Sequence, residues 1–408
     1  WDLGLLVACL VAVGGVSASL ALSLWRQVGW PMERLLTLVG RFVNDPMSSM
    51  REARRAEQRG KDNSSDLMVV ERAIKKFGSL LQLGFGEAGG RIIQANMVDG
   101  AMDVSHGGNV TQAVFGFCDI RKFSQCTEAL QGDVVKVVNR VAHYVHTAVT
   151  ELHGAPNKNI GDAFLLVWKP KGKLSASQVA DSSLLSFIRV VIEISRCKEL
   201  ERLAKRPTLQ RRVPGYRVNL GFGLHYGWAI EGSIGSQHKI DASYLSPHVN
   251  ISSRLESATK QFGVCLLLSE DLFKLLSEPV QRLCRRIDRV ILVGSDRPLE
   301  IYTYDVADPG PEVEISEIPS VPVGQFLAAM VPPRSSDDFR QLWEMALDKY
   351  LGGPFGSEAN WGMARDLLER LRDRYPEDKP TSVLLAFMEE HDFEAPPQWP
   401  GYRTLSEK

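Results

Sequence analysis

The alternation of short β-type runs with longer helical segments in residues 110–306 constrains the fold of this chain more than any other feature. Strand-like runs are expected at 113–118, 155–168, 217–231, 264–268 and 300–305, and the second of these predicts a hairpin. Helical periodicity is expected at 133–152, 177–203 and 249–261. Mixed strands and helices over this length predict one α+β domain of ordinary size.

Composition narrows the class of protein without identifying it. The 408 residues are 44% apolar and 24% charged, which is enough apolar material for a sizeable core. The formal net charge of -1 gives no overall bias towards nucleic acid, so no nucleic-acid partner is expected. The six cysteines are scattered without metal-ligand spacing, as in a cytosolic domain with reduced thiols.

An uncharged apolar run from residue 3 to residue 24 predicts a membrane-spanning helix within residues 1–25. About 20 such residues suffice to cross the hydrocarbon layer. Basic residues outnumber acidic ones just after the run, so the positive-inside rule places the C-terminal side in the cytoplasm. A cleavable signal peptide is the alternative, although the run is long for one and lacks a basic start. Because residue 1 is Trp, the chain is also expected to be a fragment or a processed product.

The segments on either side of the α+β domain are expected to be helical. Residues 26–108 contain an amphipathic pattern at 31–44, which loosely resembles the first helix of a HAMP-type signal converter; a plain juxtamembrane helix is the alternative. A second helical stripe at 67–94 needs a partner to cover its apolar face, and we expect it to carry a signal to the domain. The domain is assigned to 109–306, a linker to 307–334 and a helical tail to 335–408. The aromatic residues of the tail predict docking onto the domain: Trp343, Tyr350, Trp361 and Trp399.

Three separated segments of the domain carry residues that suggest chemistry. Asp119 follows an apolar strand, in the string Phe-Cys-Asp-Ile-Arg-Lys-Phe of residues 117–123. Asp162 lies at a tight turn between two strands, in the string Asn-Lys-Asn-Ile-Gly-Asp of residues 157–162. Asn250 and Arg254 are four residues apart in a helical segment, and this spacing puts them on one face of the helix.

Two carboxylates at strand ends suit a pair of Mg²⁺ ions bound to a triphosphate. Mg²⁺ prefers one or two carboxylates plus phosphate oxygens to a cage made entirely by protein. Two metal ions about 4 Å apart can activate an attacking hydroxyl and stabilise the leaving oxygen together. Taken singly, Asp119 and Asp162 would be ordinary turn or capping residues, and Arg254 a solvated helix residue. The combination of the three segments therefore carries the hypothesis.

The strings around Asp119 and at 158–162, 227–236 and 250–256 resemble the catalytic domain of class III adenylyl and guanylyl cyclases, in the same order along the chain. Residues 115–118 and 241–247 are similar to a membrane-anchored branch found in algae and protists. The resemblance implies a ferredoxin-like α+β fold. It also implies an adenylate cyclase, a lyase that converts ATP to 3′,5′-cyclic AMP and pyrophosphate.

The resemblance implies a metal site and a phosphate site. Asp119 and Asp162 would bind two ions per site, Mg²⁺ or Mn²⁺, with help from the carbonyl of Ile120. Backbone amides near Phe123 would hold phosphates.

The resemblance also implies residues for the purine, the ribose and the transition state. Lys158 and Ser243 occupy the purine-selecting positions, Asn250 would orient the ribose, and Arg254 would stabilise charge in the transition state. Such preorganised charge is commonly the largest catalytic term, and losing one donor costs roughly 10²–10³ in rate.

The residue types at the purine positions favour ATP over GTP. Lysine donates hydrogen bonds and accepts none, so Lys158 suits the bare N1 of adenine and not the N1–H of guanine. Ser243 can donate or accept, so it permits the adenine amino group without requiring it. Asp241 is a second candidate acceptor, because strand alternation puts it on the same face as Ser243.

In the family, the metal carboxylates come from one subunit and the purine and transition-state residues from the other. This chain carries both sets, so the resemblance implies a homodimer with two composite sites. One departure is Val293, which stands where such cyclases usually have a phosphate-binding Lys; Arg297 and Lys122 are candidates to replace its charge. A Gly-Asp pair usual near residues 246–247 is also missing. The alternatives to an adenylyl cyclase are therefore a guanylyl cyclase and a catalytically weak or silent membrane subunit with an assembly role.

Overall fold

The computed structural model describes three stretches of the chain. These are residues 2–30, 108–306 and 337–405, apart from gaps at 171, 173, 237–238, 294, 296, 354–355 and 357, with isolated positions at 32–86, 323 and 327. The chain divides into two compact units, one of residues 1–108 with 232–243 and one of 109–231 with 244–408. Each unit is described by itself.

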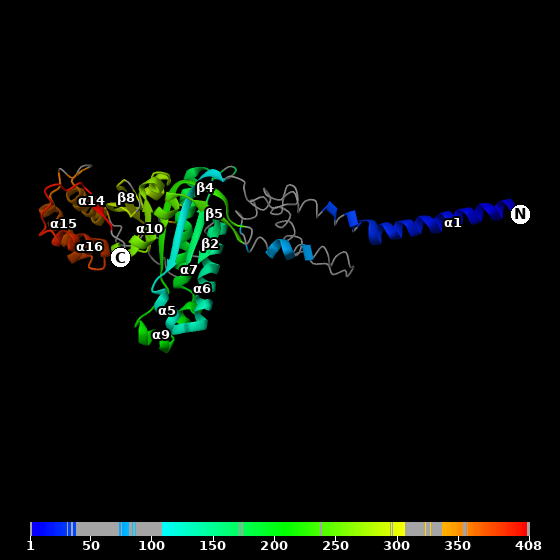
Figure 1. The fold of residues 1–408 in the computed structure, drawn as a ribbon, viewed down its shortest axis with the longest axis horizontal. Helices are drawn as coiled ribbons and strands as arrows, with labels where there is room; N and C mark the ends of the chain where they lie inside the picture. The colour runs from blue at the N-terminus through cyan, green and yellow to red at the C-terminus, as the bar shows by residue number, and fades with distance from the viewer. Residues whose placement is uncertain are drawn as a thin grey trace. The chain divides into compact units, whose positions relative to one another are not determined.

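The first unit contains helix α1 (Asp2–Leu24), the short π-helix η1 (Trp25–Gly29), and parts of two strands that continue into the second unit. Figure 1 shows α1 in blue. Among the described residues, no helix is both long and apolar enough to qualify as a membrane span. The predicted transmembrane helix at residues 1–25, and the membrane location derived from it, are therefore not supported. The expected helices at 31–44 and 67–94 and the linker at 307–334 lie largely outside the described residues.

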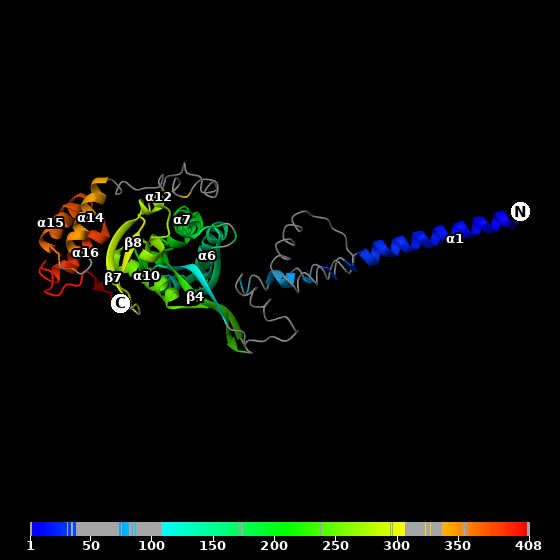
Figure 2. The same cartoon turned by 90° about the horizontal axis from the view of Figure 1, so that it is seen from above.

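A mixed sheet forms the centre of the second unit (Figures 1 and 2). It has nine strands in the order β2-β3-β1-β4-β6-β8-β7-β9, and β5 also pairs with β4. Pairing is antiparallel for β1 with β3 and β4, and parallel for β4 with β6. The strands are β1 (Asn109–Ile120), β2 (Gly154–Ile160), β3 (Ala163–Trp168), β4 (Leu220–Ser236), β5 (Lys239–Leu245), β6 (Leu266–Ser269), β7 (Arg285–Ile291), β8 (Leu299–Thr303) and β9 (Arg403–Thr404).

One face of the sheet is covered by α6 (Val134–Glu151), α7 (Ala176–Ser195) and α8 (Lys198–Ala204). Their apolar sides pack with Phe222 and Trp168 in one large core. The succession β1-α6-β2-β3-α7-β4, with β1 between β3 and β4, is the ferredoxin-like βαββαβ arrangement. The α+β class is thus confirmed. The helix expected at 177–203 is wrong in one respect, because Cys197 adopts an extended conformation and separates α7 from α8.

Helix α10 (Pro247–Phe262) lies on the other face, in a second core. Strand alternation explains the division, since Leu266 and Leu268 of β6 join the first core and Leu267 joins the second. Short helices complete the domain: α5 (Phe123–Leu130), η2 (Gln131–Asp133), α9 (Pro207–Arg212), α11 (Glu270–Phe273) and α12 (Glu278–Gln281).

The tail forms three helices, coloured orange to red in Figures 1 and 2: α14 (Asp337–Leu351), α15 (Trp361–Arg374) and α16 (Lys379–Glu389). All four predicted aromatic residues are buried in the core shared with α10 and β7, which confirms that they dock the tail on the domain. Buried ions reinforce the junction: Arg285 of β7 pairs with Asp378 before α16 at 3.0 Å, and Arg403 of β9 pairs with Asp288 at 2.6 Å.

Candidate active site

The structure brings the two predicted metal ligands together. Asp119 is the penultimate residue of β1 and pairs with Ala163, the first residue of β3. Asp162 precedes Ala163, in the two-residue turn that joins β2 to β3. Gly161 begins this turn with a φ of +66°, a backbone conformation that hairpin turns require and that glycine adopts without strain. The register and the turn place both carboxylates at one end of the sheet.

The electrostatics of this pair fit a site for cations. Burial, a hydrogen bond with Asp119 and the charge of Asp119 raise the pKa of Asp162 to about 6. Two carboxylates this close repel each other when both are ionised, and a bound cation relieves that repulsion. In this structure Lys260 reduces the repulsion between the two carboxylates, since its Nζ lies 3.6 Å from Oδ2 of Asp119.

Helix α5 supplies backbone donors next to the carboxylates. Lys122 adopts a left-handed conformation, with φ +58°, and the helix starts at Phe123. The first amides of a helix have no partner within the helix and point towards any anion placed there. The predicted phosphate-binding amides near Phe123 therefore lie at the start of a helix of eight residues, three residues beyond Ile120.

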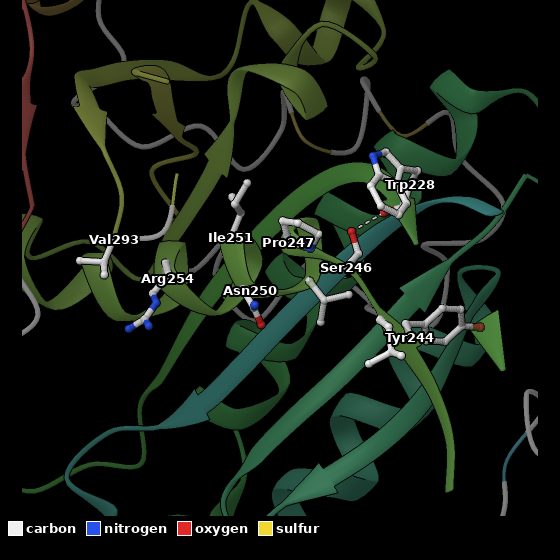
Figure 3. Close-up of a pocket in the computed structure, with 10 residues that line it drawn as sticks. Trp228, Tyr244, Ser246, Pro247, Asn250, Ile251, Arg254 and Val293 are labelled. Carbon is white, nitrogen blue, oxygen red and sulfur yellow. Dashed lines mark hydrogen bonds between the residues drawn. The ribbon is translucent and has the colours of Figure 1, made fainter. Parts of the chain in front are cut away.

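Asn250 and Arg254 line an open pocket of about 620 Å³ on one side of α10. Figure 3 shows both side chains projecting from the helix towards the same side, with Val293 beside Arg254. The described lining is Trp228, Tyr244, Leu245, Ser246, Pro247, Val249, Asn250, Ile251, Arg254 and Val293. Ser246 caps α10 and donates a hydrogen bond to the carbonyl of Trp228 at 2.5 Å, which anchors the start of the helix at the pocket wall.

Glycines of β4 let α10 approach the sheet very closely. A Cβ at Gly221 would meet the Arg121 guanidinium, one at Gly223 would meet the backbone of Ser252, and one at Gly227 would meet the His248 ring. These glycines alternate along β4, so they share the face under α10.

His225 lies between Gly223 and Gly227 on this face of β4, and it contacts the start of α10. Its Nε2 lies 2.7 Å from Nδ1 of His248, and its Nδ1 lies 2.7 Å from Oγ of Ser269. The β4 face therefore holds α10 in one rotational setting, which determines the direction of Asn250 and Arg254.

Arg121 ties the carboxylate end of the domain to the same helix. Its Nη1 lies 2.8 Å from Oε1 of Glu256, an ion pair without the alignment of a hydrogen bond. Its Nη2 donates to the hydroxyl of Thr259 and, at 3.5 Å, to the carbonyl of Glu256. Burial raises the pKa of Glu256, and the charge of Arg121 acts in the opposite direction.

The two predicted halves of the site are separate within one chain. Neither Asp119 nor Asp162 lines the pocket of Arg254. Lys260, which contacts Asp119, follows Arg254 by six residues, and six residues of α-helix correspond to about 9 Å and a turn of about 240°. Helix α10 thus points Arg254 and Lys260 in different directions.

The purine positions lie on strands. Lys158 is half-buried in β2, where it pairs with Leu165 after an irregularity in the strand. Asp241 and Ser243 lie on β5 and are both half-buried, on the same face by alternation. Both belong to the first unit, so their geometry is described only within their hairpin.

The position of the missing phosphate-binding lysine is in the pocket. Val293 is 41% exposed and lines it beside Arg254. Of the two candidates to replace that charge, Arg297 pairs with Asp271 at 3.1 Å, and Lys122 is exposed at the start of α5. Neither is among the lining residues of the pocket.

Comparison with known families agrees with this geometry. The family model of the adenylate and guanylate cyclase catalytic domain matches residues 108–306, which include both carboxylates, Asn250 and Arg254. Residues 108–306 are a class III nucleotide cyclase catalytic domain. A second model, of the all-helical domain of RasGEFs, matches residues 2–98.

Several curated relatives of the cyclase domain carry adenylate cyclase names. An adenylate cyclase of Anabaena cylindrica is 28% identical over 189 residues, 46% of this chain and 35% of the relative. The terminal-differentiation specific adenylate cyclase of Dictyostelium discoideum is 24% identical over 191 residues, which is 46% of this chain and 8% of the relative. The chain thus spans about a third or less of the length of these two relatives. A solved bacterial light-regulated adenylyl cyclase is 21% identical, with a TM-score of 0.46 over 65% of this chain and 72% of that one.

Several residues that shape the cyclase site were not given a role from the sequence. Glu256, Thr259 and Lys260 continue the helix of Arg254, but their contacts with Arg121 and Asp119 depend on how α10 crosses β1. The recurrence of Gly221, Gly223 and Gly227 at even spacing in a strand was the available signal, because such glycines mark a close approach of another backbone.

Proposed function

We propose that this cyclase domain is an adenylyl cyclase that converts ATP to 3′,5′-cyclic AMP and pyrophosphate in a homodimer with two composite sites. The observation that carries the proposal is the meeting of Asp119 and Asp162 at one end of the sheet, with Asn250 and Arg254 presented together in a separate pocket. The adenylate cyclase names of the relatives support the choice of reaction.

The residues present fit a pair of divalent cations. In the described part of the chain no group of three or more His, Cys, Asp or Glu side chains could hold a metal by itself. Mg²⁺ and similar ions do not need such a cage, since one or two carboxylates with phosphate oxygens and water suffice. Asp119, Asp162 and the Ile120 carbonyl are hard oxygen donors, so they suit Mg²⁺ or Mn²⁺ brought with ATP. When bound, the ions would lower the pKa of the ribose hydroxyl and neutralise phosphate charge.

The reaction forms a bond from the ribose 3′ oxygen to the α-phosphorus and breaks the bond from that phosphorus to the bridging oxygen of the leaving pyrophosphate. The 3′ hydroxyl loses its proton to water, and the pyrophosphate leaves with the electron pair of the broken bond. In this proposal Asn250 holds the ribose, so that the hydroxyl is aimed at the phosphorus. Arg254 donates to the oxygens on which charge accumulates, and the α5 amides near Phe123 hold phosphates.

The separation of the two halves supports a homodimer. Neither Asp119 nor Asp162 lines the pocket of Arg254 in its own chain, so in this proposal a second chain supplies the carboxylates that face Arg254. Lys158 and Ser243, with Asp241 as the second acceptor, are the proposed contacts of adenine. Lysine beside adenine N1 favours ATP, since it cannot accept the N1–H of guanine. A substrate of this kind, together with five free cysteines in the described residues, supports a cytoplasmic location for the domain.

Complementation between two inactive variants tests the proposal. Asp119→Ala and Arg254→Ala homodimers are each expected to lose activity by at least about 100-fold. Mixing the two chains assembles one intact site in each mixed dimer, so ATP-dependent release of cyclic AMP should return. Failure to recover on mixing would rule out composite sites. Turnover of GTP in place of ATP would indicate a guanylyl cyclase, and no turnover of either by the wild type would indicate a silent subunit.

A further inference from the structure

One buried cluster connects the metal end of the cyclase domain to the catalytic helix. Arg121 follows Asp119 by two residues, and its side chain reaches Glu256 and Thr259, which lie three residues apart in the second half of α10. Its backbone amide is also fixed, because it donates to the carbonyl of Asn219 at 2.9 Å. The chain just after Asp119 is therefore held at the backbone and at the tip of a long side chain.

Burial restricts Arg121 and Glu256 to one geometry. The Arg121 side chain is 18% exposed and Glu256 only 5%, so water compensates these charges much less than it would at the surface. The space for the pair exists only because residue 221 is glycine, since a Cβ there would collide with both the guanidinium and the carboxylate. A buried ion pair with several further hydrogen bonds specifies one geometry, because removing a partner leaves a buried charge uncompensated.

We propose that Arg121 and Glu256 are positioning residues that hold Asp119 in place for metal binding. This inference rests on the proposed function. Asp119 itself approaches Lys260 of the same helix, so α10 contacts the metal end at three successive points: Glu256, Thr259 and Lys260. In the dimer, one helix would then present Arg254 to one site and steady the carboxylates of the other.

A purely electrostatic role makes a different prediction. Glu256 carries a negative charge near the metal site and Arg121 a positive one. If only their charges mattered, Glu256→Gln would weaken cation binding and Arg121→Gln would strengthen it. If they position Asp119, both substitutions weaken binding, because each one releases the same segment.

Mn²⁺ titration by electron paramagnetic resonance measures this directly on the full chain. The protein is mixed with 3′-deoxy-ATP, which lacks the attacking hydroxyl, so that metal binding is read without turnover. Arg121→Gln and Glu256→Gln should each raise the Mn²⁺ dissociation constant about tenfold, the lower end of what loss of a partner of a metal ligand costs. Glu193→Gln is the matched control. It breaks another partly buried pair, with Arg189 at 2.9 Å on α7, and should leave Mn²⁺ binding unchanged.

Two outcomes would overturn this inference but leave the proposed function standing. In the first, the Mn²⁺ dissociation constants of Arg121→Gln and Glu256→Gln shift in opposite directions. In the second, the wild type binds Mn²⁺ and both variants bind it equally well. A wild type that binds no Mn²⁺ would remove the proposed function as well. Arg121→Lys is a second variant with a lower risk of misfolding, because it keeps a positive charge near Glu256. It loses the hydrogen bond that Nη2 donates to Thr259, and it should weaken Mn²⁺ binding by less than Arg121→Gln does. If Arg121→Lys binds Mn²⁺ as the wild type does, while a folded Arg121→Gln binds it weakly, the positive charge alone would explain the effect. That result would contradict the inference.

Mixed dimers locate the effect. A dimer of Asp119→Ala and Arg254→Ala chains has one intact site, whose carboxylates come from the Arg254→Ala chain. Glu256→Gln placed in that chain should raise the Mn²⁺ concentration for half-maximal activity about tenfold. The same substitution in the Asp119→Ala chain should leave that concentration unchanged. Equal effects from both chains would show that Glu256 does not act on the neighbouring Asp119.

Discussion

Substitution of Gly223 by alanine tests whether α10 is seated on β4 as described. A Cβ at this position would lie far inside 3.0 Å of the Ser252 carbonyl and the Glu256 amide, a separation that real Cβ atoms essentially never show. The obstacles are backbone atoms, so no side-chain rotation relieves them. Ordinary contact begins at 3.4 Å, and the helix must therefore retreat by about 1 Å, since packed interiors leave no spare room.

The retreat should affect activity more than folding. Overpacking of this kind typically costs about 1–3 kcal/mol of stability, which for a domain of this size is a fall of about 5 °C in Tm. A displacement of about 1 Å at catalytic groups can cost about 100-fold in rate, because Asn250 and Arg254 move with the helix. The assay is cyclic AMP release at saturating ATP beside thermal unfolding. Gly132→Ala is the control, since a Cβ there meets nothing within 4 Å. Wild-type activity and Tm in Gly223→Ala would refute the close approach of α10 to β4.

Three further predictions concern the pocket, the tail and a buried histidine. Val293→Lys adds an ammonium to the pocket and should lower the KM for ATP about tenfold by a charge-assisted hydrogen bond to phosphate; Val293→Gln is the control for size, and equal effects would contradict the reasoning. Asp378→Ala leaves Arg285, which is 4% exposed, with a partner missing, and should destabilise the protein by about 3 kcal/mol in denaturant unfolding; Glu278→Ala, which breaks a largely exposed pair with Arg282, should cost under about 1 kcal/mol. Burial, with the neighbouring His248, lowers the pKa of His225 to about 3, so its contribution to stability is complete above its unfolded pKa of about 6.5 and is lost as the pH falls below it. Unfolding free energy between pH 7 and 5 should therefore fall by about 1–2 kcal/mol more in the wild type than in His225→Asn, and parallel curves would contradict the assignment.

Much of the fold was accessible from the sequence because its signals are local. The hairpin predicted at 155–168 matches β2 and β3, and the helix predicted at 133–152 differs from α6 by one residue at each end. Period-2 and period-3.6 patterns report which face of an element is buried, and they need no knowledge of partners. The apolar run at residues 3–24 did predict a helix, which is α1, while the predicted membrane span is not supported among the described residues. Strand β7, which packs between the domain and the tail, was missed because its sequence is mostly charged: Arg285, Arg286, Asp288 and Arg289.

The sequence by itself determined which residue types lie at the strand ends and at the turn of the cyclase domain. Asp119, Asp162, Asn250 and Arg254 could be chosen from the motifs because turns and helix faces depend on neighbours close in the chain. Only the tertiary structure decided that the carboxylates meet, that Arg254 turns away from them, and that Arg121 binds the helix of its own chain. Those relations depend on how α10 crosses β1 and β4, and a crossing is set by contacts between residues more than 100 positions apart, which no local pattern encodes.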